Sequence, residues 1–231
     1  MGLLEKADEM EPETKDSKMG PAHEIRADHV SSDIQAEDFD HRAWQRANPV
    51  RLTRYWSGED APPGRHAEGR VIWSDQALNV RFLAQQNEPF VITPNPLTIK
   101  KTMGLWERDV CEIFIAPNAA EPNRYFEFEA APTGEWIDLA IHLTPEKKET
   151  DWDFDSGMTA AGRVHKNHVF VAMRIPWDDW IRRPQRGDKW RTNLFRCVGR
   201  GENRGYLAWQ PTFTKEPYFH VPQVFQWLRF A

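Results

Sequence analysis

The sequence predicts an all-β protein, an antiparallel β-sandwich of the jelly-roll-like or immunoglobulin-like type with one or two short helical turns. Short runs in which apolar and polar residues alternate recur along the chain, and turns rich in Gly, Pro, Asp and Asn separate them, which is typical of antiparallel strands. The 231 residues include 11 Trp and 13 Phe, enough for one large buried core.

The domain organisation follows from the distribution of these runs. Residues 1–22 have little to bury and are expected to form a disordered acidic tail. Residues 23–231 are expected to form a single β-sandwich domain without internal repeats. The predicted strands share apolar alternation or an excess of β-branched and aromatic residues, and lie at 23–27, 70–73, 77–83, 110–115, 124–130, 136–143, 164–175, 192–198 and 207–209. Short helical turns are predicted at 40–44 and 176–181.

Composition disfavours several classes of protein. A net charge of −5 and a pI near 5.9 argue against a nucleic-acid partner, which requires a basic face. No apolar run approaches the ~18 residues needed to span a membrane. The first residues lack the apolar stretch of a signal peptide, which predicts a cytoplasmic protein; an extracellular location requires an incomplete or misassigned start. Cys111 and Cys197 are expected to be buried free thiols rather than a disulfide.

The predicted strand at 110–115 carries a carboxylate on an apolar face. Residues alternate along a strand, so Glu112 shares its face with Val110 and Phe114. Because desolvation of a lone carboxylate is costly, Glu112 requires a buried partner or an open groove. An aromatic beside an acceptor in a groove indicates sugar binding, since the ring covers the apolar face of a pyranose and the carboxylate accepts from its hydroxyls. Trp106 is the nearby aromatic.

The next two predicted strands add further acids. Glu127 and Glu129 share one face of the strand at 124–130. In the strand at 136–143 the odd-numbered Ile and Leu residues form an apolar face, taken here as the core face, and Asp138 lies opposite. If the three strands are neighbours, as sequential strands usually are, their second faces together form one surface of aromatics and acids.

Four motifs follow one another along the chain: WExDVxEIFI from Trp106, YFEF from Tyr125, WRxNxxR from Trp190 and FHxPxxFxxLxF from Phe219. In these motifs, and from about Val50 to the C-terminus, the chain resembles the family 9 carbohydrate-binding modules and their stand-alone, DOMON-like relatives. The resemblance implies an antiparallel sandwich that binds a mono- or oligosaccharide between two aromatics without catalysis. It also implies a role in polysaccharide recognition or breakdown, with a glycoside hydrolase as the candidate partner.

The resemblance assigns roles to particular residues. Trp106 and Glu112 correspond to the first aromatic of the family and to the carboxylate six residues later. The second aromatic of the family is typically a Trp just before the final strand. Phe219 or Tyr218 stands there in this chain, and the register of the last motif favours Phe219.

Three further residues are expected to hydrogen-bond the sugar. Glu127 would accept from hydroxyls, while Asn193 and Arg196 would donate. Residues three apart in a regular strand face opposite sides, so both donors line one site only if a bulge intervenes.

Other interpretations stay open at the level of sequence. Trp106 can instead shield a sheet edge, and Glu112 can form a structural ion pair with Arg124 or Arg196. A glycoside hydrolase would use Glu112, Glu127 and Asp138 as its acid and base or nucleophile. A haem-binding redox sandwich is the other alternative, with ligands drawn from Met173, His142, His165 and His168.

No cofactor is predicted with certainty. The family often carries structural calcium, and the acidic run at 151–155 offers the hard oxygens that calcium prefers. The run lacks the Gly and the distal Glu of an EF-hand loop, which favours an exposed acidic loop. The sequence does not specify the sugar, the calcium ligands or the oligomeric state.

Overall fold

A computed structural model describes residues 24–231, and the predicted tail over residues 1–22 lies outside them. The described chain consists mainly of strands, as the sequence predicts. The strands are β1 (Glu24–His29), β2 (Val50–Leu52), β3 (Arg54–Tyr55), β4 (Ala67–Trp73), β5 (Ala77–Gln85), β6 (Val110–Ala116), β7 (Arg124–Ala130), β8 (Trp136–Leu143), β9 (Lys148–Asp151), β10 (Thr159–Val164), β11 (His168–Pro176), β12 (Lys189–Val198), β13 (Gly205–Ala208) and β14 (Gln226–Phe230).

The helical elements are short. They are the α-helix α1 (Ala43–Arg46) and the 3-10 turns η1 (Pro63–Arg65), η2 (Leu105–Glu107), η3 (Gly201–Asn203) and η4 (Pro222–Val224). The helical turn predicted at 176–181 is wrong, because Asp178 and Ile181 form an isolated β-bridge that closes a tight turn. The strand predicted at 164–175 is a hairpin, β10 followed by β11, which turns around residues 165–167.

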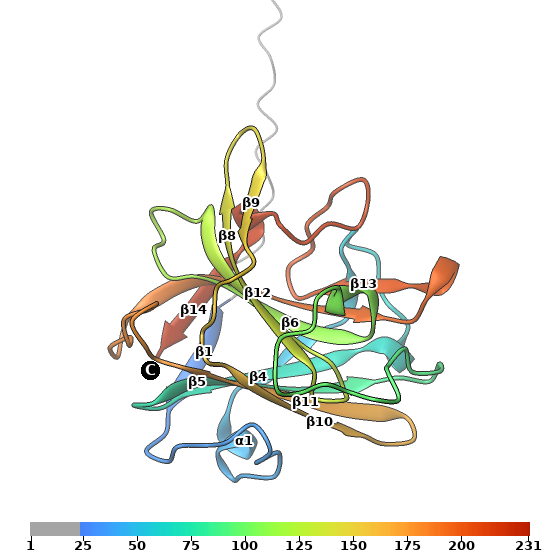
Figure 1. The fold of residues 1–231 in the computed structure, drawn as a ribbon, viewed down its shortest axis with the longest axis horizontal. Helices are drawn as coiled ribbons and strands as arrows, with labels where there is room; N and C mark the ends of the chain where they lie inside the picture. Colours follow the sequence, from blue (N-terminus) through green and yellow to red (C-terminus); the bar gives the residue numbers. More distant parts are fainter. Residues whose placement is uncertain (1–23) are drawn as a thin grey trace, which may run out of the picture.

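The strands form two layers (Figure 1). We call the strands β9-β8-β7-β6-β12-β14, with β13 beside β12, the site sheet, and the strands β4-β5-β11-β10, with β2 beside β4, the back sheet. Strand β1 joins the layers, because Glu24 to Ala27 pair in parallel with β14 whereas Asp28 and His29 pair in parallel with β4. The helix α1 packs through Trp44 against Ile72 on the outer side of the back sheet.

The centre of the site sheet is buried on both of its faces. All seven residues of β6 are buried. Ile113 and Ile115 pack between the layers with Phe82 of the back sheet, in one apolar cluster. Phe114 belongs to a second cluster on the outer face, which the C-terminal segment covers with Phe219 and other side chains. The strand alternation therefore places two apolar cores, one on each side of the same sheet.

This double burial corrects one prediction from the sequence. In the pairing of β7 with β8, Leu139 lies opposite Glu127, and residues directly opposite in an antiparallel pair point to the same side. The odd-numbered Ile and Leu residues of β8 thus share the outer face with the acids. Asp138 points to the inner side, where it pairs with Lys101 at 2.9 Å and accepts from the backbone N–H of Ser156 at 2.6 Å. Asp138 is not part of the acidic surface.

The two cysteines also lie on opposite faces of the site sheet. Cys111 of β6 lies opposite Arg196 of β12, and both point to the inner side. Cys197 follows Arg196 in β12 and therefore points outward. Both thiols are buried and free. Among residues 24–231 no helix has the length and apolar character needed to cross a membrane.

A buried polar network holds the two layers together at one end. The guanidinium of Arg196 donates to the carbonyls of Arg65 and Gln85, both at 2.7 Å, and to the side-chain oxygen of Gln86 at 3.0 Å. The amide of Gln86 then donates to Asp109 at 2.7 Å. Asp109 also accepts the backbone N–H groups of Val91 and Gly199, both at 2.8 Å.

Arg196→Met is expected to lower the free energy of unfolding by about 3 kcal/mol, because Met fills the volume but leaves three acceptors without their donor. The urea midpoint of unfolding measures the effect. Arg200→Met makes the same chemical change at an exposed position and is expected to have little effect. Equal midpoints for the two variants would show that the network contributes no stability.

Candidate functional site

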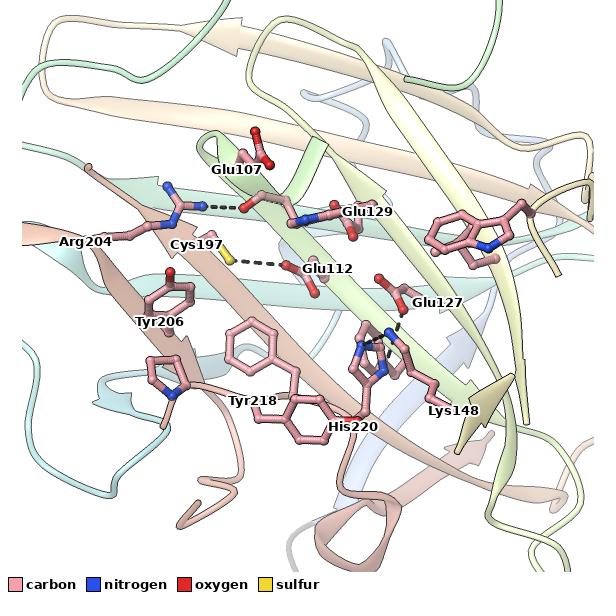
Figure 2. Close-up of a pocket in the computed structure, with 16 residues that line it drawn as sticks. Glu107, Glu112, Glu127, Glu129, Lys148, Cys197, Arg204, Tyr206, Tyr218 and His220 are labelled. Atoms are coloured by element: carbon pink, nitrogen blue, oxygen red, sulfur yellow. Dashed lines mark hydrogen bonds and ion pairs between the residues drawn. The ribbon is translucent and has the colours of Figure 1, made fainter. Parts of the chain in front are cut away.

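A cavity of about 480 Å³ opens on the outer face of the site sheet. Its floor is formed by β6, β7, β8 and β12, and its rim by η2, the segment after β9, β13 and residues 217–220. Figure 2 shows Glu112, Glu127 and Glu129 together in this cavity, with His220 and Lys148 at one end and Arg204 and Tyr206 at the other. The residues that line it come from segments far apart in the sequence.

The 3-10 turn η2 presents Trp106 at the rim. The turn begins at Gly104, whose φ of 74° is left-handed and favours glycine. The guanidinium of Arg204 donates to the carbonyl of Trp106, to that of Arg108 at 2.9 Å and to that of Gly199 at 2.7 Å. The backbone on both sides of the indole is thus fixed, while 37% of Trp106 stays exposed.

A second indole, missed by the sequence analysis, stands beside the first. The ring of Trp152 lies 6.2 Å from that of Trp106 between centroids, and 45% of Trp152 is exposed. It sits in the acidic run at 151–155, where Asp151 and Asp155 accept from backbone N–H groups two residues later. These aspartates are exposed, as the loop interpretation expects. The sequence did offer one signal for this residue, because Trp152 is an aromatic among acidic residues in a predicted loop.

The opposite rim carries the two aromatics proposed for the second half of a clamp. Phe219 is 9% exposed and stacks on Phe195 with centroids 4.1 Å apart. Tyr218 is 43% exposed. Both line the cavity, but Phe219 already uses one ring face in the outer apolar cluster, whereas Tyr218 contacts His220 edge-on and keeps more of its ring exposed to a ligand.

The three glutamates converge at the floor. Glu112 pairs in register with Glu129, and each of the three offers an oxygen within 4.8 Å of the others. Burial, followed by repulsion from Glu127, raises the pKa of Glu112 to about 8. Burial also raises the pKa of Glu127 and, together with the two neighbouring carboxyls, raises that of Glu129 well above its usual range. The sequence analysis placed Glu129 on this face but did not include it in the site.

A hydrogen-bonded chain flanks the glutamates. His220 stacks on Phe114 with centroids 5.3 Å apart, and its Nδ1 lies 2.8 Å from the hydroxyl of Tyr125. Burial, with a smaller effect of Lys148, lowers the pKa of His220 to about 3, so the ring is neutral at neutral pH. Its Nε2 accepts from Lys148 at 2.9 Å.

Two predicted donors lie away from the cavity. Strand β12 pairs with β6 in regular register from Arg191 to Cys197, so no bulge brings Asn193 and Arg196 to one side. Asn193 is buried and exchanges hydrogen bonds with the backbone of Gln210, at 2.9 and 3.0 Å. Arg196 lies between the layers. Their predicted role as ligand donors does not fit this placement, and Arg204 and Lys148 are the cations that line the cavity.

The sequence model of one protein family, carbohydrate family 9 binding domain-like, matches residues 38–226 of the chain. The chain belongs to this family. The resemblance noted in the sequence is therefore confirmed, and the match covers every strand from β2 to β13. A comparison with curated proteins gives no match.

Solved structures agree on the fold. A protein from Bacteroides uniformis, provisionally described as carbohydrate-binding, is 16% identical with a TM-score of 0.71, over 91% of this chain and 100% of its own. A family 9 module from Caldicellulosiruptor kristjanssonii in complex with glucose is 16% identical with a TM-score of 0.62, over 90% and 96%. The module from the same organism in complex with cellotriose is 17% identical with a TM-score of 0.60, over 90% and 94%.

The raised pKa of Glu112 makes a pH-dependent prediction about stability. Between pH 4.5 and about 8 the Glu112 carboxyl holds a proton in the folded state that it releases in the unfolded chain. The contribution of Glu112 to stability is therefore complete below pH 4.5 and is lost as the pH rises toward about 8. Glu112→Gln is therefore expected to gain stability relative to the wild type across that interval, by on the order of a few kcal/mol.

Melting temperatures of the wild type and the variant over this pH range measure the effect. Only their difference is informative, because the lowered pKa of His220 acts in the opposite sense between pH 3 and 6.5. Glu37→Gln, an exposed carboxylate beside the back sheet, controls for the loss of one charge. A constant difference between wild type and Glu112→Gln would contradict the assignment.

Proposed function

We propose that the cavity binds a mono- or oligosaccharide without catalysing a reaction. The main support for this proposal is an open cavity with exposed aromatic rings on its rim and carboxyl groups on its floor. A pyranose has an apolar face that packs on a ring and hydroxyls that pair with carboxyls. The relatives in complex with glucose and cellotriose support this choice of ligand class.

Trp106 and Tyr218 are the proposed clamp, with Trp152 extending the surface beside Trp106. The register of the last sequence motif favours Phe219 as the second aromatic. Exposure favours Tyr218, since a ring that stacks on Phe195 within the protein has only its other face for a sugar. Glu112 and Glu127 are the proposed hydrogen-bonding groups, and because their pKa values are raised they can donate as well as accept.

The hydrolase alternative finds less support in this geometry. Such an enzyme needs one ionised and one protonated carboxyl on either side of the scissile bond. Glu112, Glu127 and Glu129 lie side by side on one floor and all have raised pKa values, while Asp138 lies behind the sheet. Release of reducing sugar by the wild type, absent from Glu112→Gln, would overturn the binding proposal.

The haem alternative also lacks a site in this cavity. Met173 is buried between the layers, and His142 pairs with Glu149 at 3.1 Å on the edge of the site sheet. A role in polysaccharide recognition, a glycoside hydrolase partner and the cellular location stay predictions from the sequence.

Trp106→Ala is expected to weaken binding of glucose or cellotriose by about 1–3 kcal/mol, because the loss of a stacking ring removes a main anchor. Isothermal titration calorimetry measures the change, and circular dichroism is expected to be unchanged. Trp227→Ala, which removes an indole of β14 that contacts Arg191 away from the cavity, is the matched control. A variant that unfolds would instead place Trp106 among the structural residues.

Tyr218→Ala is expected to weaken sugar binding about tenfold, as for other aromatic anchors, and to leave stability unchanged. Phe219→Ala is expected to cost about 3 kcal/mol of stability, because it empties a position packed on Phe195. Binding by calorimetry and stability by urea titration separate the two roles. Lost binding in a folded Phe219→Ala, with normal binding in Tyr218→Ala, would return the clamp to Phe219.

A further inference from the structure

Glu129 is a buried carboxyl group without a donor. It is fully buried at the floor of the cavity, where no N–H group or hydroxyl of the protein donates to its oxygens and its side-chain hydrogen-bonding partner is the carboxyl of Glu127. Its polar neighbours are the carboxyls of Glu112 and Glu127. A buried acceptor that lacks a donor carries a desolvation cost that hydrogen bonds normally offset. The missing donor can come from a ligand, because Glu129 lines an open cavity.

The cations of the cavity make their hydrogen bonds to groups other than the three glutamates, and they act on the glutamates only through their charge, which lowers the pKa values of the carboxyls. Arg204 uses its guanidinium on three backbone carbonyls around η2. Lys148 donates to His220, which is neutral. One buried oxygen of Glu127 has no hydrogen bond and lies 3.8 Å from Nδ1 of His220. The ionisable groups that line the cavity or its flank, beyond the three floor glutamates, are Glu107, Tyr125, Lys148, Cys197, Arg204, Tyr206, Tyr218 and His220.

We propose that the cavity selects amino sugars. The ammonium group that replaces one hydroxyl on the sugar ring would donate to Glu112, Glu127 and Glu129. A hydroxyl offers one proton, whereas an ammonium offers three donors and a positive charge, which matches three carboxyls that meet within 4.8 Å. The aromatic rim favours an organic cation over a bare metal ion, since rings pack on a sugar and attract a cation at their faces. This inference rests on the proposed sugar-binding function.

Protons are linked to the binding of such a ligand. Burial raises the pKa values of the three glutamates, and repulsion from neighbouring carboxyls raises those of Glu112 and Glu129 further. An ammonium at their centre favours the ionised forms, so binding releases protons from the carboxyls to the buffer. A neutral sugar of the same shape has no charge to cause that release.

The test compares three ligands that differ at one ring position: glucosamine, glucose and N-acetylglucosamine. Calorimetry on the full chain at neutral pH is expected to give glucosamine an affinity at least about tenfold above the other two, as for a charge-assisted contact in place of a neutral one. Titrations in two buffers of different ionisation enthalpy are expected to show proton release with glucosamine alone.

Variants of the floor locate the effect. Glu129→Gln is isosteric and is expected to remove the preference for glucosamine while glucose binding persists, and Glu127→Gln is expected to reduce that preference. Glu37→Gln is the control for the loss of one carboxylate. Circular dichroism confirms that each variant is folded.

Three results would overturn the inference. Equal affinity for glucose and glucosamine would remove the amino-sugar preference and leave sugar binding in place. Failure of glucosamine, glucose and cellotriose alike to bind would remove the proposed function as well. Calcium chloride alone, if its binding heat depends on Glu129 and it blocks glucosamine, would assign the three carboxyls to a metal ion instead.

Discussion

The carboxylate of Asp109 is the contact on which the geometry of the cavity depends. It joins three segments, since it accepts from Gln86 just after β5, from Val91 in the loop that follows and from Gly199 just after β12. Arg196 extends the network to Gln86 and to the carbonyls of the back sheet. Asp109 lies two residues after η2, so its contacts fix the chain that leaves this turn, while Arg204 binds the carbonyl of Trp106 within the turn and that of Arg108 at its end.

The outer face of the site sheet combines stability with a site for a ligand. Most of this face is covered by apolar residues, with Phe195 and Phe225 in the same cluster as Phe114. Glu112, Glu127 and Glu129 lie where this face forms the floor of the cavity. Because the surrounding surface is apolar, water does not solvate the carboxyls well, and their pKa values rise. The packing that stabilises the sheet thus also sets the protonation of the floor.

Sequence pattern predicted what depends on alternation within a strand, and it failed where a second layer decides the outcome. Glu127 and Glu129 were placed on one face of their strand correctly because strand periodicity fixes the relative direction of residues two apart. Asp138 was placed wrongly, because β8 is apolar on a face that turns out to be the outer one, and alternation does not say which face is which. Trp152 and Arg204 were missed because loops carry no periodicity, and only the tertiary fold brings them to the cavity.

Strand β1 has a consequence for how the chain is made. Its pairing with β14 joins Glu24 to Arg229, which are 205 residues apart, and the same strand continues into the back sheet. The ribosome must therefore release β14 before the site sheet gains this shared strand, whereas the pairing of Asp28 and His29 with β4 needs only the chain up to Trp73. Until β14 is made, β1 and β12 each have an open edge on the side where β14 will pair, and unpaired edges can join other chains. Contacts this distant in sequence also slow folding. The stage most prone to aggregation is thus the one that precedes the synthesis of β14.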